Sequence, residues 1–198
     1  MLTSFVVWSR TRPVAFGIAM SVLFVVLLEV AITVGFVTIE DTDVGLYRHY
    51  GEAIAGGAVP YRDISIEYPP GALPLFVAPA VLTSTPEAYR LVFKALMVLA
   101  IAALVVGVRR LQQEDANRGV AAVAATVVLI AILGSVALTR FDVVPAALTV
   151  GVLVYFVQVR WGIGAVLLGI AIATKLYPAV LPRSLRSTQH AAPAVVSR

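Results

Sequence analysis

Apolar and polar stretches alternate along the chain on the length scale of membrane-spanning helices. A helix that crosses a bilayer needs about 20 mostly apolar residues. Five segments satisfy this requirement, at residues 14–38, 89–108, 120–138, 142–159 and 162–181. The last four are joined by short connections, which favour a tightly packed antiparallel bundle. The pattern therefore predicts an all-α integral membrane protein, a multispanning helix bundle with about five spans.

A sixth apolar stretch, residues 71–82, is too short to be counted with these spans. It is interrupted by Pro74 and Pro79, and apolar segments of this length are more often re-entrant or interfacial than spanning. A polar, acidic loop at residues 39–70 precedes it. We therefore expect a short re-entrant or interfacial helix after an external loop.

The distribution of arginine predicts the orientation. The positive-inside rule places Arg10 and Arg12 in the cytoplasm, the 39–70 loop outside, and the basic 109–118 connection and Arg160 inside. This gives a cytoplasmic N-terminus at 1–13, a transmembrane domain at 14–182 and a polar tail at 183–198, expected to be disordered. Basic residues in the tail would then lie outside. If 71–82 also spans, the tail moves inside and the 109–118 connection moves out.

Composition narrows the class of protein further. Of 198 residues, 60% are hydrophobic and only 13% charged, too few charges to cover a soluble domain of this size. Cysteine is absent from the sequence, which excludes disulfides, thiolate zinc sites and cysteine nucleophiles. The net charge of +4 is scattered and forms no basic tract for nucleic acid. The expected partner is the lipid bilayer.

The external loop carries the most informative pattern. Thr42 is a candidate N-cap for an amphipathic helix that begins at Asp43 and ends at Gly56-Gly57. Asp43, Tyr47, Tyr50 and Ile54 are spaced to share one face of that helix. One carboxylate and two phenols would therefore meet at the membrane boundary.

Two further groups of residues follow in the loop. Pro60-Tyr61-Arg62-Asp63 predicts a turn, and the double proline of Glu67-Tyr68-Pro69-Pro70-Gly71 predicts an extended entry into the short apolar element. A rigid, aromatic, acidic loop above an apolar bundle suits the processing of a lipid-linked polar substrate.

Taken together, these loop motifs resemble a known family. Asp43-x-x-x-Tyr47, Gly57-x-x-Pro60-Tyr61 and Glu67-Tyr68-Pro69-Pro70-Gly71 are similar to the first external loop of glycosyltransferase family 87, polyprenyl-phosphate-mannose-dependent α-mannosyltransferases of the GT-C superfamily. Arg140-Phe141-Asp142 and Lys175-x-x-Pro178 extend the resemblance. Family members have roughly twice this many residues and more spans, so the resemblance implies that the chain corresponds to their N-terminal half. A second chain supplying the missing spans is a further expected partner.

The resemblance implies an inverting transfer of mannose from a polyprenyl phosphate donor to a lipid or glycan acceptor on the external face. Asp43 matches the catalytic position and would be the general base. Cations are expected beside the leaving phosphate. The expected substrate-binding residues are Tyr47, Arg62, Glu67, Tyr68, Arg140, Asp142 and Lys175. The polyprenyl chain would lie in an apolar groove between spans. Nothing in the sequence requires a metal, although Asp43, Asp63 and Glu67 could gather one, and the lipid-linked donor is the small molecule expected at the site.

Structural interpretations of the same residues remain open. Asp142 is a candidate helix N-cap, Lys175 a candidate snorkelling residue, and Arg62 a candidate partner for Asp63. The loop tyrosines also fit an interfacial aromatic belt. The alternative function is a non-catalytic membrane protein, either truncated or a partner subunit that binds polyprenyl lipid.

A small transporter is the third hypothesis, with intramembrane charges at Glu29, Lys94 and Lys175. It ranks last because the polar motifs gather at one face. The abundance of Ala, Val and Arg with little Lys is typical of a GC-rich bacterium. The expected location is therefore the bacterial plasma membrane.

Overall fold

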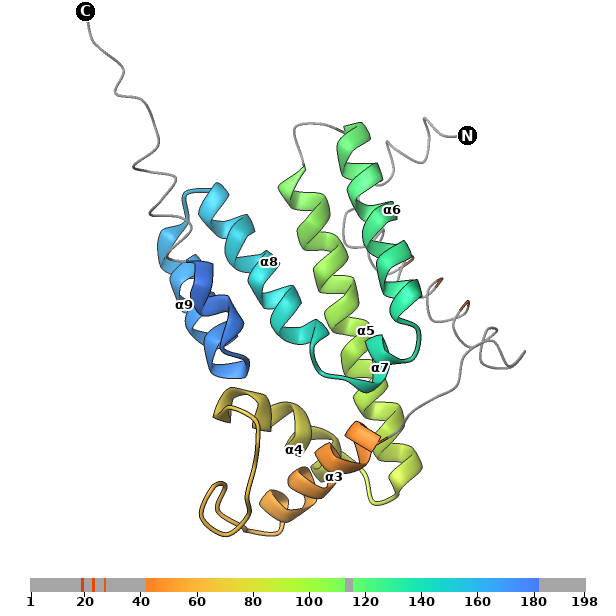
Figure 1. Ribbon diagram of the computed structural model, residues 1–198, viewed down its shortest axis with the longest axis vertical. Coiled ribbons are helices and arrows are strands. Elements are labelled where there is room, and N and C mark those ends of the chain that lie inside the picture. Colours follow the sequence, from red (N-terminus) through yellow and green to blue (C-terminus); the bar gives the residue numbers. More distant parts are fainter. Residues whose placement is uncertain (1–18, 20–22, 24–26, 28–41, 113–115, 182–198) are drawn as a thin grey trace, which may run out of the picture.

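The computed structural model describes residues 42–112 and 116–181, together with Ala19, Leu23 and Leu27 (Figure 1). The first predicted span, Glu29 and the terminal segments 1–13 and 183–198 lie outside the described residues, apart from those three isolated positions. In chain order the elements are α3 (Thr42–Ala55), the 3-10 helix η1 (Pro70–Ala72), α4 (Leu73–Leu82), α5 (Pro86–Leu111), α6 (Ala116–Leu133), α7 (Val136–Thr139), α8 (Val143–Val157), α9 (Trp161–Thr174) and the 3-10 helix η2 (Tyr177–Val180). The predicted all-helical class is confirmed over this part of the chain.

The long helix α5 is the central element of the bundle. Its start follows from local sequence: Thr85 is the N-cap and accepts a hydrogen bond from the Ala88 amide at 3.2 Å, and Pro86 occupies the first turn. Its 26 residues extend about 39 Å. Within the described ranges, α5 is the helix long and apolar enough to cross a membrane, and the other apolar helices are shorter.

Two predicted spans are interrupted in the structure. The segment 120–138 divides into α6 and α7 at Gly134, whose φ of 57° suits glycine and ends the helix. The segment 162–181 stops being α-helical at Lys175, which is extended. Pro178 explains this stop, because it has no N–H to bond the carbonyl of Thr174 in a continued helix. The count of five spans therefore stays a prediction.

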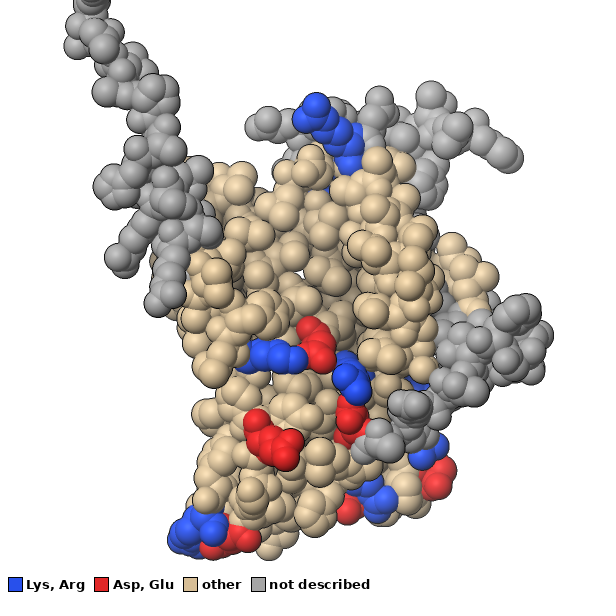
Figure 2. All heavy atoms as spheres, viewed as in Figure 1, with Lys and Arg blue, Asp and Glu red and all other residues tan. Residues whose placement is uncertain are grey.

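Helices α5, α6, α8 and α9 stand side by side, and α3 with α4 lies across one end (Figure 1). Large aliphatic side chains point outward from this bundle, including Leu91 and Leu99 on α5, Ile132 on α6 and Val166 on α9. On the face drawn in Figure 2, the described part of the bundle is largely free of charged residues, and most of the charged side chains gather near α3 and α4. Such a surface fits contact with lipid better than contact with water.

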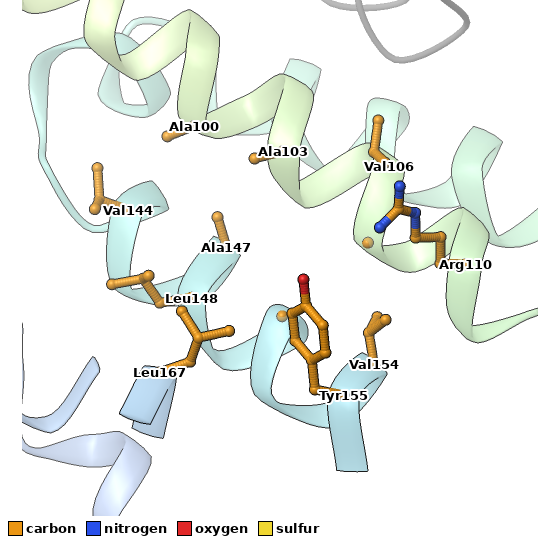
Figure 3. Close-up of a pocket in the computed structure, with 12 residues that line it drawn as sticks. Ala100, Ala103, Val106, Arg110, Val144, Ala147, Leu148, Val154, Tyr155 and Leu167 are labelled. Atoms are coloured by element: carbon orange, nitrogen blue, oxygen red, sulfur yellow. The ribbon is translucent and has the colours of Figure 1, made fainter. Parts of the chain in front are cut away.

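The packing of α5, α8 and α9 leaves a cavity of about 390 Å³ (Figure 3). It arises because facing positions carry very small side chains, such as Ala103 on α5 and Ala147 and Gly151 on α8. It extends along α8 from Val144 near the α8 N-terminus to Tyr155 near its C-terminus. The apolar groove expected for a polyprenyl chain stays a prediction, and the lining of this cavity is apolar apart from Arg110 and Tyr155.

Helices α3 and α4 cover one end of the bundle and pack closely against each other. The helix α3 is close to its predicted bounds, but Thr42, the predicted N-cap, is its first helical residue. Gly57 ends the helix with φ of 99°, and the amides of Gly57 and Ala58 donate hydrogen bonds to the carbonyls of Ile54 and Ala53. At Gly51 an added Cβ would lie 2.1 Å from the carbonyl oxygen of Phe76, so α3 and α4 meet at backbone distance.

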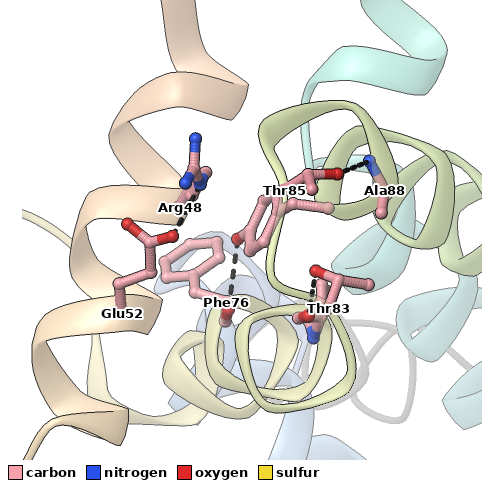
Figure 4. A network of polar contacts seen from close by, with 8 residues as sticks. Arg48, Glu52, Phe76, Thr83, Thr85 and Ala88 are labelled. Atoms are coloured by element: carbon pink, nitrogen blue, oxygen red, sulfur yellow. Dashed lines mark hydrogen bonds and ion pairs between the residues drawn. The ribbon is translucent and has the colours of Figure 1, made fainter.

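The α4 backbone is tied to α5 as well. Figure 4 shows the region where the Tyr89 hydroxyl donates to the Phe76 carbonyl at 3.1 Å, next to the Arg48–Glu52 ion pair on α3. The predicted short element at 71–82 is thus a 3-10 turn and a ten-residue helix packed on α3 and α5.

Candidate functional site

Aromatic rings form the floor of the candidate site. Tyr47 on α3 stacks on Phe76 of α4 with ring centroids 4.4 Å apart, and the rings of Tyr68 and Phe141 meet it edge-on at 5.5 and 5.9 Å. Tyr47 is 2% exposed. Burial raises the pKa of its phenol far above the usual value, and a hydrogen bond to Tyr68 and the charges of Asp43 and Asp142 add to that effect. The Tyr47 ring is therefore a neutral, fixed support for its neighbours.

The candidate base lies at the edge of this floor. Asp43 lies in the first turn of α3, and its Oδ2 is 2.7 Å from Nε of Arg140, which follows α7. The Asp43 side chain is 27% exposed and that of Arg140 52%. Exposed ion pairs of this kind stabilise a fold by about 0–1 kcal/mol. The pair can therefore open at small cost when another anion or a hydroxyl approaches.

A second ion pair lies immediately beside the first. Lys175, just after α9, pairs through Nζ with Oδ1 of Asp142, and its ammonium lies 5.5 Å from the ring centre of Phe141. Asp142 occupies the N-cap position of α8, but its side chain makes no capping hydrogen bond. The simple N-cap interpretation of Asp142 therefore does not describe its contact, since the carboxylate faces Lys175.

A glycine sets the distance between the loop and α9. At Gly71 an added Cβ would lie 2.5 Å from the carbonyl carbon of Ala173 and 2.8 Å from the amide nitrogen of Thr174. The loop motif that ends at Gly71 thus reaches the backbone at the end of α9, one residue before Lys175. This contact brings the loop and the second ion pair to the same end of the bundle.

The structure brings together Asp43, Tyr47, Tyr68, Arg140, Asp142 and Lys175 from the predicted set. It does not bring Arg62 to them. Arg62 is 71% exposed and pairs with the adjacent Asp63, which also accepts a hydrogen bond from the Val59 amide. This pairing holds the pKa of the Asp63 carboxyl below its usual value. Arg62 therefore belongs to the fold of its own turn.

Glu67 makes no ion pair with the residues that the structure brings together, but its charge acts on a tyrosine next to them. Its side chain is exposed, and its charge acts on the phenol of Tyr50, where burial and then Glu67 raise the pKa. Within residues 42–112 and 116–181, no three His, Cys, Asp or Glu side chains are placed to share a metal ion.

Sequence reasoning missed two features of the site. Phe76 joins the aromatic floor, although it looked like one more apolar residue of a short membrane element. The pairing of Asp43 with Arg140 was also missed, because the two residues are far apart in the chain. The motif residues themselves were visible in the sequence, but nothing in their spacing specified which carboxylate meets which cation.

The sequence profile of glycosyltransferase family 87 matches residues 67–196, more than half of the chain. The chain belongs to glycosyltransferase family 87. This is a GT-C family of membrane glycosyltransferases, in agreement with the apolar exterior of the bundle. No curated protein sequence and no solved structure matches the chain.

The family 87 match includes part of the candidate site. Tyr68, Arg140, Asp142 and Lys175 lie inside the matched range, as does Glu67 at its start. Asp43, Tyr47 and Arg62 precede it. The assignment of Asp43 therefore rests on its contact with Arg140 and on the loop motif, independently of this match.

Proposed function

We propose that this family 87 chain transfers a mannosyl group, with inversion, from a polyprenyl phosphate to a hydroxyl of a lipid or glycan acceptor at the external face of the membrane. The observation that carries the proposal is the pair of adjacent ion pairs, Asp43–Arg140 and Asp142–Lys175, on an aromatic floor at one end of an apolar bundle. A carboxylate and phosphate-binding cations are the two kinds of group that this transfer needs.

In the proposed step, Asp43 accepts the proton of the acceptor hydroxyl while the oxygen of that hydroxyl forms a bond to the anomeric carbon. The bond between that carbon and the phosphate oxygen breaks, and the electron pair leaves with the phosphate. Arg140 and Lys175 stabilise the charge that develops there, because charge-assisted hydrogen bonds to phosphate are strong. Arg140 would turn from Asp43 to the phosphate, which frees the carboxylate for the acceptor.

The remaining residues keep these groups in place. Asp142 would hold Lys175 until the donor arrives, and the packed rings of Tyr47, Tyr68 and Phe76 would fix the loop against α4. The polyprenyl chain would extend from the site into the bilayer along the apolar helices. A bacterial plasma membrane with the α3 end outside is the location that fits this proposal.

The decisive test is mannose transfer by the purified chain in detergent, with radiolabelled polyprenyl-phosphate-mannose and a crude lipid acceptor. Replacing Asp43→Asn should lower transfer by roughly 100-fold or more, the usual size of a general-base contribution. Donor binding should stay within a few-fold of the native chain. Glu52→Gln is the matched control, an exposed carboxylate on the same helix that pairs with Arg48, and it should retain full transfer.

The opposite results are equally clear. Transfer that persists in Asp43→Asn would remove Asp43 from the mechanism. Donor binding without transfer by the native chain would favour the alternative function, a partner subunit that binds polyprenyl lipid.

A further inference from the structure

The cavity between α5, α8 and α9 has a polar end far from the two ion pairs. Of the residues that line it, Arg110 and Tyr155 carry polar side chains, and both lie near the C-terminal ends of their helices. Figure 3 shows the Arg110 guanidinium and the Tyr155 hydroxyl pointing toward the same space. The rest of the wall is made of Ala, Gly, Val and Leu. The cavity is therefore amphipathic along its length.

Arg110 is available to a ligand. It is exposed, and it makes no hydrogen bond or ion pair with any residue that the structure describes. Its neighbour Arg109 is buried and donates through Nη1 to the Gln112 carbonyl at 3.2 Å. Arg160 lies over the Tyr155 ring, 5.4 Å from its centre. Among the described residues, this end of the cavity therefore carries positive charge, and the nearest acidic residues in sequence, Glu114 and Asp115, lie outside that part of the chain.

The dimensions suit one hydrocarbon chain of a phospholipid. Val144 to Tyr155 covers about 16 Å along α8 at 1.5 Å per residue. That length is about half of the roughly 30 Å hydrocarbon core of a bilayer, which is the depth of one leaflet. In the proposed transfer the donor phosphate lies beside the reacting carbon at Arg140 and Lys175, so under that proposal a different phosphate occupies this polar end.

We propose that an anionic membrane phospholipid binds in this cavity, with one acyl chain between α5, α8 and α9 and its phosphate at Arg110 and Tyr155. Arg110 supplies up to two parallel hydrogen bonds to phosphate oxygens, and the tyrosine hydroxyl supplies another. The chain fills space that Ala103, Ala147 and Gly151 leave empty. This lipid supports the packing of α8, and hence the position of Asp142, without entering the transfer step.

The test uses the full chain, delipidated in detergent, and compares phosphatidylglycerol with phosphatidylcholine of the same acyl chains. Phosphatidylglycerol should raise the Tm of the native chain more than phosphatidylcholine does, because a ligand that binds the folded state stabilises it. In Arg110→Gln its apparent Kd, measured by native mass spectrometry, should rise about tenfold, the loss of one charge-assisted contact. Arg62→Gln, an arginine at the other end of the molecule, should bind like the native chain.

A second variant tests the cavity independently of the charge of Arg110. Gly151→Leu fills the cavity and should lower the number of tightly bound phospholipids by one. Native mass spectrometry reports this number directly for the fraction of protein that is folded. Unchanged binding of phosphatidylglycerol in Gly151→Leu would overturn the placement of the acyl chain.

Three other results would overturn the proposal. The first is equal stabilisation by the two lipids, which would mean that Arg110 is neutralised within the chain. The second is an unchanged Kd in Arg110→Gln. The third is displacement of phosphatidylglycerol by polyprenyl phosphate, which would assign the cavity to the donor. Donor binding at Lys175 is measured separately, so failure of the lipid site and failure of the transfer proposal remain distinguishable.

Discussion

The four charged residues of the candidate site form a short chain of contacts. Asp43 pairs with Arg140, Phe141 separates Arg140 from Asp142, and Asp142 pairs with Lys175. Each pair is partly exposed, so neither stabilises the fold by more than about 1 kcal/mol. Residues that contribute so little to stability, placed together on a fixed aromatic floor, fit a role in recognition or chemistry better than a role in folding.

Tyr47 predicts an alkaline limit to the stability of the fold. Its pKa is raised in the folded chain, chiefly by burial, so the unfolded chain loses this proton more readily. The contribution of the neutral phenol is fully present below pH 10, the ordinary tyrosine pKa, and is lost as pH rises toward the folded value. Thermal unfolding in detergent between pH 8 and pH 11 measures this loss.

The Tyr47→Phe variant isolates that group. It should be less stable at pH 8 by about 1 kcal/mol, for the lost hydrogen bond, and its stability should fall less steeply above pH 10. Tyr50 retains part of the pH dependence, because its pKa is also raised. Tyr177→Phe, an exposed tyrosine, should follow the native curve. Parallel curves for the native chain and Tyr47→Phe would refute the interpretation.

Among the elements, the loop and α9 meet through backbone atoms at Gly71. A methyl group there would push against the Ala173 carbonyl group and the Thr174 amide, which are backbone and move only with the end of α9. Gly71→Ala should therefore destabilise the chain by about 1–3 kcal/mol, the usual cost of overpacking. It should also weaken donor binding, since Lys175 follows directly after this contact.

Gly45 offers a matched control for that substitution. It lies within α3, and an added Cβ there has no atom within 4 Å. Gly45→Ala should be neutral or stabilise the chain by up to about 1 kcal/mol through helix propensity. Equal unfolding temperatures for Gly71→Ala and Gly45→Ala would show that the close approach at Gly71 does not limit the stability of the fold.

Element boundaries were predictable where local signals decide them. The Gly56-Gly57 pair defines the end of α3, and Thr85 with Pro86 defines the start of α5. Longer apolar segments were less predictable, because hydrophobicity alone does not register a left-handed glycine at 134 or the missing amide of Pro178. The candidate site followed the same rule: its residues were visible, but their pairing depends on how the helices pack.

For the whole molecule, the basic residues give a testable orientation. Arg109, Arg110, Arg118 and Arg160 lie at the ends of α5 and α8 and the starts of α6 and α9, the bundle end opposite α3 and α4 (Figure 1). The positive-inside rule then predicts that this end lies in the cytoplasm and the candidate site outside.

Single cysteines can report this orientation cleanly, because the sequence contains none. Ser65→Cys lies in the exposed loop and Gln158→Cys in the exposed turn before α9. A membrane-impermeant thiol reagent should label position 65 in intact cells and position 158 only after permeabilisation. The reverse pattern would invert the proposed orientation, and labelling of both in intact cells would place both ends on one side.

The balance of charge at the site has a consequence for how the donor arrives. Asp43, Arg140, Asp142 and Lys175 contribute two negative and two positive charges within one small cluster. Their fields nearly cancel at a distance, so the cluster provides little electrostatic steering of an anion through the aqueous phase. Capture of the donor should then depend on its surface density and lateral diffusion in the membrane, and vary little with the ionic strength of the surrounding medium.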